Sequence, residues 1–258
     1  MSAVLQIVQL YPAELGVTGD RGNVRALEVR AERAGLTVQT TRVGIGEPLP
    51  ADADIIVIGN GPLSAMRGVH ADLQARHAGL AAAIADGVVV LAVGAGAELL
   101  SMGVELLDGQ TVEGLGVLPF RVERTRDRRV GYVIAMTPHG RLIGFEDHAS
   151  TWVLAPEAQV YGEVTAGIGS FILDSSREGA PRRGETVRHE NAFATNVQGP
   201  VLPLNPQLAD ELLRAAAARR GLVYETATGH AVLDELAAGA RSAIEGRIDV
   251  ETFTYMKV

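Results

Sequence analysis

The chain contains no cysteine among its 258 residues. This absence excludes disulfides, thiolate metal sites and cysteine nucleophiles together. Lysine is almost as scarce, because Lys257 is the single lysine among 23 basic residues. The sequence therefore has no phosphate-binding GxxxxGK[ST] loop, and covalent chemistry on a lysine amine is disfavoured.

Aromatic residues and long apolar runs are also rare. Only 4% of the residues are aromatic although 47% are hydrophobic, so Val, Leu, Ile and Ala must build the core. No run reaches the roughly 18 apolar residues that cross a bilayer. The net charge of −8 argues against nucleic-acid and membrane-surface partners. The N-terminal residues show no basic segment ahead of an apolar stretch, so we expect a cytoplasmic protein. The six histidines show no metal-ligand spacing, and we expect no metal or cofactor.

The first half of the chain alternates strand and helix patterns. Strands are predicted at 4–8, 37–43, 54–60 and 88–93, and amphipathic helices at 20–34 and 66–86. Asp20 and Asn23 are interpreted as a helix cap. This order predicts an α/β fold, with a mostly parallel central sheet and helices on both faces.

The second half is predicted to add further β segments. Strands at 116–124 and 130–136 are expected to be joined by a charged turn at 124–129. Later elements are short strands near 143–145, 160–164 and 170–173, an exposed loop at 174–188, a strand at 192–197, and helices at 206–220, capped by Asn205, and at 229–246. No repeat or long linker divides the chain.

The turn after strand 88–93 is the most informative feature. A buried strand, a tight turn and a helix present the reactive Ser or Cys in many α/β enzymes. Here the turn is Gly94-Ala95-Gly96, with no nucleophilic side chain. The simplest interpretation is a turn without chemistry, and the alternative is ligand binding by its N–H groups. A dinucleotide fingerprint is disfavoured because Leu99 stands at the third glycine position.

Two other segments are expected beside this turn. The loop 59–62 and the segment 197–200 also lie at predicted carboxyl ends of strands, where open α/β sheets place their sites. Ser64 and Ser101 lie near these loops, but neither occupies the turn that would hold a nucleophile.

Several motifs together identify a family. They are DRGN at 20–23, IGNG at 58–61, VEGLGVL at 112–118, Arg128, GFEDH at 144–148 and GPVLP at 199–203. With this layout the chain, from about residue 4 to 225, resembles class I glutamine amidotransferase domains of the cobyric acid synthase type. Within them it is most similar to the glutaminase subunits of lipid II isoglutaminyl synthases, which pair with a Mur-ligase-like subunit.

The resemblance implies roles for individual positions. In this family a Cys at the turn attacks the glutamine side-chain amide, and a His is its general base and acid. Gly94 stands at the Cys position and Gln198 at the His position. Gly59, Asn60, Gly61 and Ala95 correspond to the loop and turn whose N–H groups stabilise the oxyanion.

The resemblance also implies a ligand contact and a domain boundary. Arg128 matches a substrate-engaging position, and the plain alternative is a solvated residue of the charged turn. Glu98 replaces a neutral glutamine beside the pocket. Residues 1–225 are expected to form the amidotransferase-like domain, and 226–258 a C-terminal helical extension packed on it.

We therefore expect a catalytically inactive amidotransferase-like subunit, a scaffold or regulator of a Mur-ligase-like synthetase in a heterodimer. One alternative is an enzyme with a changed, cysteine-independent reaction on Glu98, Glu146 or His148. Another is a sensor that binds glutamine or a related small molecule at Arg128.

Overall fold

The centre of the fold is a section of parallel strands in a larger mixed sheet. This computed structural model describes residues 4–174, 181–248 and 254–257. The parallel strands, in spatial order, are β2 (Thr37–Val43), β1 (Val4–Leu10), β3 (Ile55–Ile58), β4 (Val89–Val93) and β12 (Ala192–Thr195). The prediction of a mostly parallel central sheet is confirmed.

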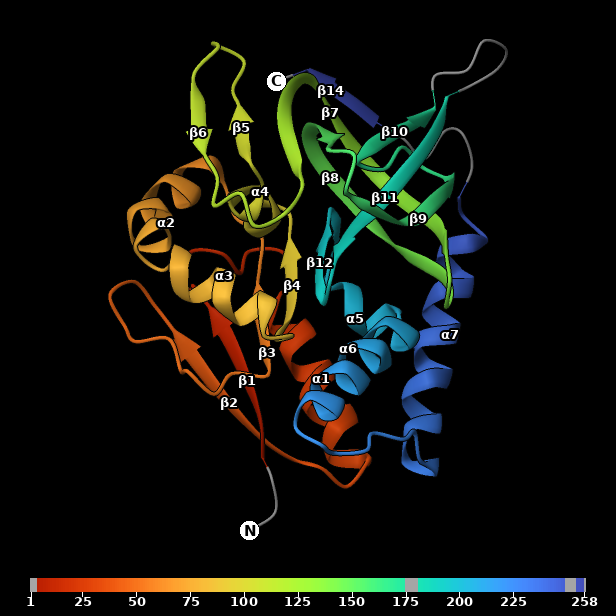
Figure 1. The fold of residues 1–258 in the computed structure, drawn as a ribbon. Coiled ribbons are helices and arrows are strands. Elements are labelled where there is room, and N and C mark those ends of the chain that lie inside the picture. Colours follow the sequence, from red (N-terminus) through yellow and green to blue (C-terminus); the bar gives the residue numbers. More distant parts are fainter. Residues whose placement is uncertain (1–3, 175–180, 249–253, 258) are drawn as a thin grey trace.

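Antiparallel strands from the second half extend this sheet beyond β12 (Figure 1). They are β11 (Arg182–His189), β9 (Gln159–Ala166), β7 (Phe120–Thr137), β8 (Gly140–Leu154) and β13 (Val197–Gln198), with β10 (Phe171–Asp174) on β11 and β14 (Thr254–Lys257) on β7. The strands β5 (Gly103–Glu105) and β6 (Thr111–Glu113) form a hairpin beside β7.

Helices cover both faces of the parallel section (Figure 1). One face carries α2 (Leu63–Ala75), α3 (His77–Ala85) and α4 (Ala95–Leu100); the other carries α1 (Arg21–Arg33), α5 (Val201–Leu204) and α6 (Pro206–Arg219). After the 3-10 turn η1 (Thr228–His230), α7 (Ala231–Glu245) packs on α5 and β8. In the described ranges, no helix is long and apolar enough to cross a membrane.

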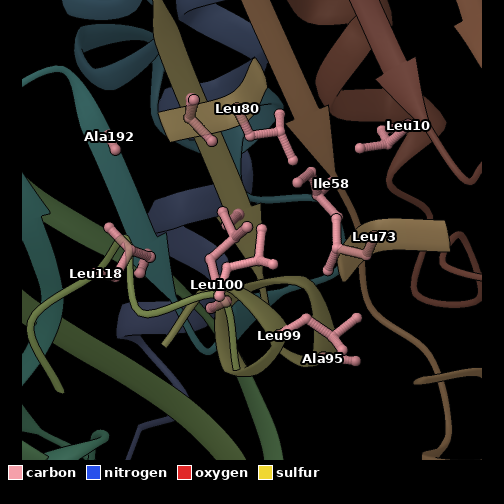
Figure 2. Close-up of a cluster of buried hydrophobic side chains, with 14 of the residues drawn as sticks. Leu10, Ile58, Leu73, Leu80, Ala95, Leu99, Leu100, Leu118 and Ala192 are labelled. Atoms are coloured by element: carbon pink, nitrogen blue, oxygen red, sulfur yellow. The ribbon is translucent and has the colours of Figure 1, made fainter. Parts of the chain in front are cut away.

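The continuous apolar runs of the central strands follow from this double covering. Successive side chains of a strand point to opposite faces. Ile56 and Ile58 of β3 therefore join the cluster under α2 to α4, while Ile55 and Val57 join the cluster under α1 and α6. Figure 2 shows Leu99 and Leu100 in the first of these clusters. The short helix after the turn is thus anchored by burial, which fixes the turn itself.

The predicted helix at 66–86 is two helices. The first ends at Ala75, and Arg76 adopts φ −89° and ψ −4° before α3 begins. The Arg76 guanidinium donates to Asp72 and to the carbonyl oxygens of Gly44 and Glu47. These contacts hold the loop after β2 and bend the chain, and apolar periodicity does not reveal them.

The predicted turn at 124–129 is also wrong, because β7 runs through it. Arg124 lies opposite Ser150 and Arg129 opposite His148, so the strand bulges between them and continues. Charged side chains at a bulge have the same polarity as those of a turn, and only the pairing with β8 distinguishes the two.

Part of the predicted loop at 174–188 is the strand β11, in which Glu185 and Val187 are buried. Residues 175–180 lie outside the described residues. The polar composition predicted an exposed loop, but the buried Glu185 carboxylate is hydrogen-bonded within the protein. It accepts hydrogen bonds from Ser170, Thr195 and the Asn196 N–H.

Asn205 precedes α6 as predicted, with Pro206 in the first turn, but its side chain does not cap the helix. Its Oδ1 accepts from the Ile143 N–H at 2.8 Å, and its Nδ2 donates to the Ile143 carbonyl at 2.8 Å. The side chain therefore ties α6 to β8.

Candidate functional site

The turn between β4 and α4 has the strained shape of a nucleophile turn. Gly94 has φ 51° and ψ −114°, a conformation that disfavours any residue with a Cβ. Its N–H donates to the Thr195 carbonyl at 2.8 Å, and its carbonyl accepts from the Glu98 N–H at 2.9 Å. The frame that would present a reactive side chain is thus intact and carries none.

The loop after β3 needs its two glycines for close packing. A Cβ on Gly59 would lie 2.2 Å from the Leu15 carbonyl oxygen, and one on Gly61 would lie 2.7 Å from the Glu14 carbonyl oxygen. Both contacts are shorter than any real Cβ allows. The loop is therefore pressed against residues 14–15, and Asn60 is its side chain nearest the turn.

Asp20 supports this loop and does not cap α1. Its backbone is already helical, and no capping hydrogen bond is present. Its buried carboxylate accepts from the Thr18 hydroxyl and from the Asn60 N–H, each at 3.1 Å. Burial raises the pKa of Asp20, while these hydrogen bonds oppose the rise. The Asn23 side chain accepts from the Leu202 N–H, so the DRGN segment organises the site from within.

A chain of amide groups joins the loop, the turn and Gln198. The Ala95 N–H donates to Asn60 Oδ1 at 2.9 Å, and Asn60 Nδ2 donates to Gln198 Oε1 at 3.1 Å. Gln198 Nε2 donates to the Asp147 carbonyl at 3.2 Å. The three segments expected to meet are therefore in contact. The Gly96 N–H donates directly to the Gly59 carbonyl at 3.1 Å, and Asn60 links both segments to Gln198. A carboxamide does not ionise near neutral pH, so neither Asn60 nor Gln198 can serve as a general acid or base.

Arg128 and Glu98 both line the site, in different electrostatic settings. Arg128 donates to Asp147 at 2.6 Å, and both side chains are about one third exposed. Glu98 is buried and paired with Arg124. Burial raises the pKa of Glu98, and the charges of Arg124 and His148 oppose that rise. The carboxylate at 98 is therefore neutralised by an arginine that sequence reasoning did not single out.

The cluster at 146–148 splits between the interior and the pocket. Glu146 is fully buried, and its oxygens accept from the N–H groups of Ile168 and Gly169 at 2.7 and 2.9 Å. His148 contacts Glu146 at 3.3 Å and the Ser150 carbonyl at 3.1 Å. Asp147 points the other way, toward Arg128. Glu146 thus lies in the interior, and His148 lines the pocket although its side chain is largely buried.

One cavity of about 850 Å³ brings these residues together. Its lining includes Asn60, Gly94, Ala95, Glu98, Arg124, Arg128, Asp147, His148 and Gln198. The mouth carries apolar side chains such as Val17 and Leu107, and the exposed Arg67. Within the described ranges no group of three or more potential ligands is arranged to hold a metal ion. The site can bind by hydrogen bonds and charge, and neither a cysteine nor a serine is among its lining residues.

A comparison of the sequence with known families identifies the family of the chain. A family model for the CobB/CobQ-like glutamine amidotransferase domain matches residues 6–205. The chain belongs to this family.

Two relatives of this CobB/CobQ-like family member are glutaminase subunits of one kind of synthase. It is 30% identical to the lipid II isoglutaminyl synthase (glutamine-hydrolyzing) subunit GatD of Staphylococcus aureus, over 86% of this chain and 88% of that protein. It is 27% identical to the GatD subunit of Streptococcus pneumoniae, over 84% and 82%. The resemblance to isoglutaminyl synthase glutaminase subunits is thereby confirmed.

A solved structure supports the fold of this family member. The glutaminase domain of CTPS from Trypanosoma brucei, with bound acivicin, superposes with a TM-score of 0.53 at 12% identity. The match covers 87% of this chain and 98% of that one.

Sequence reasoning missed Arg124 and Glu185, and it gave Asn60 only a place in the oxyanion loop, with no role for its side chain. Asn60 had one signal, its position between two close-packed glycines at a strand end. Arg124 and Glu185 had none, because each is explained by a partner distant in sequence: Glu98 for the first, Ser170 and Asn196 for the second.

Proposed function

We propose that this chain is a catalytically inactive glutamine amidotransferase-like subunit, a scaffold or regulator of a Mur-ligase-like amide synthetase in cell-wall or related amidation. The observation that carries the proposal is Gly94 in a turn of the nucleophile type, with the carboxamide of Gln198 lining the same cavity. Glutamine hydrolysis on this fold needs an attacking side chain and a base to activate it. Neither position supplies such a group.

The similarity to subunits of a larger enzyme supports a partner chain. Both are subunits of a glutamine-hydrolysing synthase, which implies a second chain. A docking surface keeps its value after the chemistry is lost, because fold and site are separable. The proposal therefore includes a heterodimer in the cytoplasm, with a synthetase that uses free ammonia or another amine.

The test is ammonia release from glutamine by the purified chain, alone and co-purified with a Mur-ligase-like synthetase of the same organism. We expect no release above buffer, with a commercial glutaminase as positive control. Gel filtration at micromolar concentration should show one complex, with an interface on the order of 1,600 Å² in total. Turnover of glutamine, or separate elution of the two chains, would contradict the proposal.

Ligand sensing is the second candidate, and the open cavity beside Arg67 and Arg128 favours it. Calorimetry with glutamine distinguishes the two candidates, because a sensor would bind the amino acid without hydrolysing it. A changed reaction on Glu98, Glu146 or His148 has less support. Glu98 is held by Arg124, and Glu146 does not line the cavity.

A further inference from the structure

The side chain of Asn60 fills the space in which a nucleophile would stand. A Cβ on Gly94 would lie 2.3 Å from Asn60 Oδ1 and 2.6 Å from its Cγ. A carbon at either distance overlaps the carboxamide. The glycine at 94 and the asparagine at 60 are therefore coupled, because one leaves the room that the other occupies.

The orientation of this carboxamide is fixed by its neighbours. A backbone N–H, that of Ala95, stands at one end of the amide chain, and a backbone carbonyl, that of Asp147, stands at the other. Only one arrangement of the two side-chain amides satisfies both ends. Asn60 must then direct its oxygen at Ala95 and its NH₂ at Gln198.

Those two directions are the ones that a substrate amide would take. On a nucleophile turn, the N–H of the residue after the nucleophile stabilises the oxyanion, and that residue is Ala95. The base, which gives a proton to the leaving amine, would stand at Gln198. Asparagine carries the same primary carboxamide as glutamine, one methylene shorter.

We infer that Asn60 is an internal substitute for the substrate carboxamide, which occupies the oxyanion position of the site. The inference rests on the proposed function and deepens it. Two features would then prevent glutamine hydrolysis. The nucleophile is missing, and the Asn60 side chain occupies the position of the substrate carboxamide. A cysteine restored at the turn would have to displace this carboxamide, because its Cβ would lie 2.3 Å from Asn60 Oδ1.

The absence of cysteine makes the test direct, because Gly94→Cys introduces the single thiol of the chain. We compare the rate of iodoacetamide labelling in Gly94→Cys and in Gly94→Cys with Asn60→Gly. Removal of the carboxamide should raise the rate at least about tenfold, because the thiol and the reagent gain the vacated space and the Ala95 N–H. Gly94→Cys with Thr125→Ala, which trims another residue of the cavity lining, is the matched control and should leave the rate unchanged.

A second measurement does not use the Gly94→Cys variant, so it remains valid if that variant folds poorly. Amide hydrogen exchange at Ala95 should be slow in the unaltered chain and at least about tenfold faster in Asn60→Gly, because the N–H loses its acceptor. Equal labelling in the pair, or unchanged exchange at Ala95, would overturn the inference.

These outcomes are separate from the proposed function. Ammonia release by the unaltered chain would contradict that function whatever Asn60 does. Equal labelling with no ammonia release would reject only the role of Asn60.

Discussion

Replacement of Arg124 by alanine should destabilise the chain by about 3 kcal/mol at neutral pH, because Glu98 keeps its burial and loses its countercharge. The Glu98 side chain is 3% exposed, so water cannot replace the guanidinium. Urea unfolding, followed by circular dichroism, measures the effect.

Two variants isolate the cause. Arg128→Ala, four residues along the same strand, breaks a pair that is about one third exposed and should change stability by less than about 1 kcal/mol. Adding Glu98→Gln to Arg124→Ala should recover most of the loss, because a neutral amide needs no countercharge. If Arg124→Ala and Arg128→Ala unfold at the same urea concentration, the buried pair does not contribute this stability.

The loss at Arg124 should also depend on pH. A carboxyl whose pKa is raised by folding contributes stability below its unfolded pKa, and this contribution is lost as the pH rises through the folded pKa. Burial raises the pKa of Glu98, and removal of Arg124 should raise it further. Arg124→Ala should therefore be less destabilising at about pH 5 than at about pH 8, and Glu98→Gln should abolish the difference.

Arg30→Ala should be as damaging, because Arg30 links three helices. Its guanidinium holds Asp210 of α6 through two hydrogen bonds at 2.7 and 2.9 Å, and Asp234 of α7 at 2.7 Å. The Arg30 side chain is 4% exposed and that of Asp210 9%. Removal should cost roughly 3–5 kcal/mol by leaving a buried carboxylate unpaired.

The control lies on the same helix. The Arg25 side chain is 65% exposed and forms an ion pair with Glu28, so Arg25→Ala should stay within about 0.5 kcal/mol. We propose that the helical extension from residue 226 packs as part of the amidotransferase-like domain through Arg30. One cooperative transition that shifts as a whole in Arg30→Ala supports this. Early, separate unfolding of α7 in the unaltered chain would reject it.

The fold class followed from local patterns that tertiary contacts did not override. The strand at 37–43 is found with the predicted bounds, and α1 and α6 differ by a residue or so at their ends. The strand errors lie where a polar segment was buried or paired with a neighbouring strand. Arg124 to Arg129 continues a strand because β8 lies alongside, and Glu185 is interior because hydroxyl and N–H donors surround it.

The sequence by itself determined that no side-chain thiol acts within these 258 residues, because composition is independent of folding. It also placed glycine at the turn, since a strand followed by Gly94-Ala95-Gly96 and a helix is a local pattern. Tertiary structure alone decided what fills the site. The contacts of Asn60 join it to residues 35 and 138 positions away, and no local pattern encodes distances across a sheet. The physical reason is that hydrogen bonds depend on positions in space, which the packing of both faces of the sheet sets.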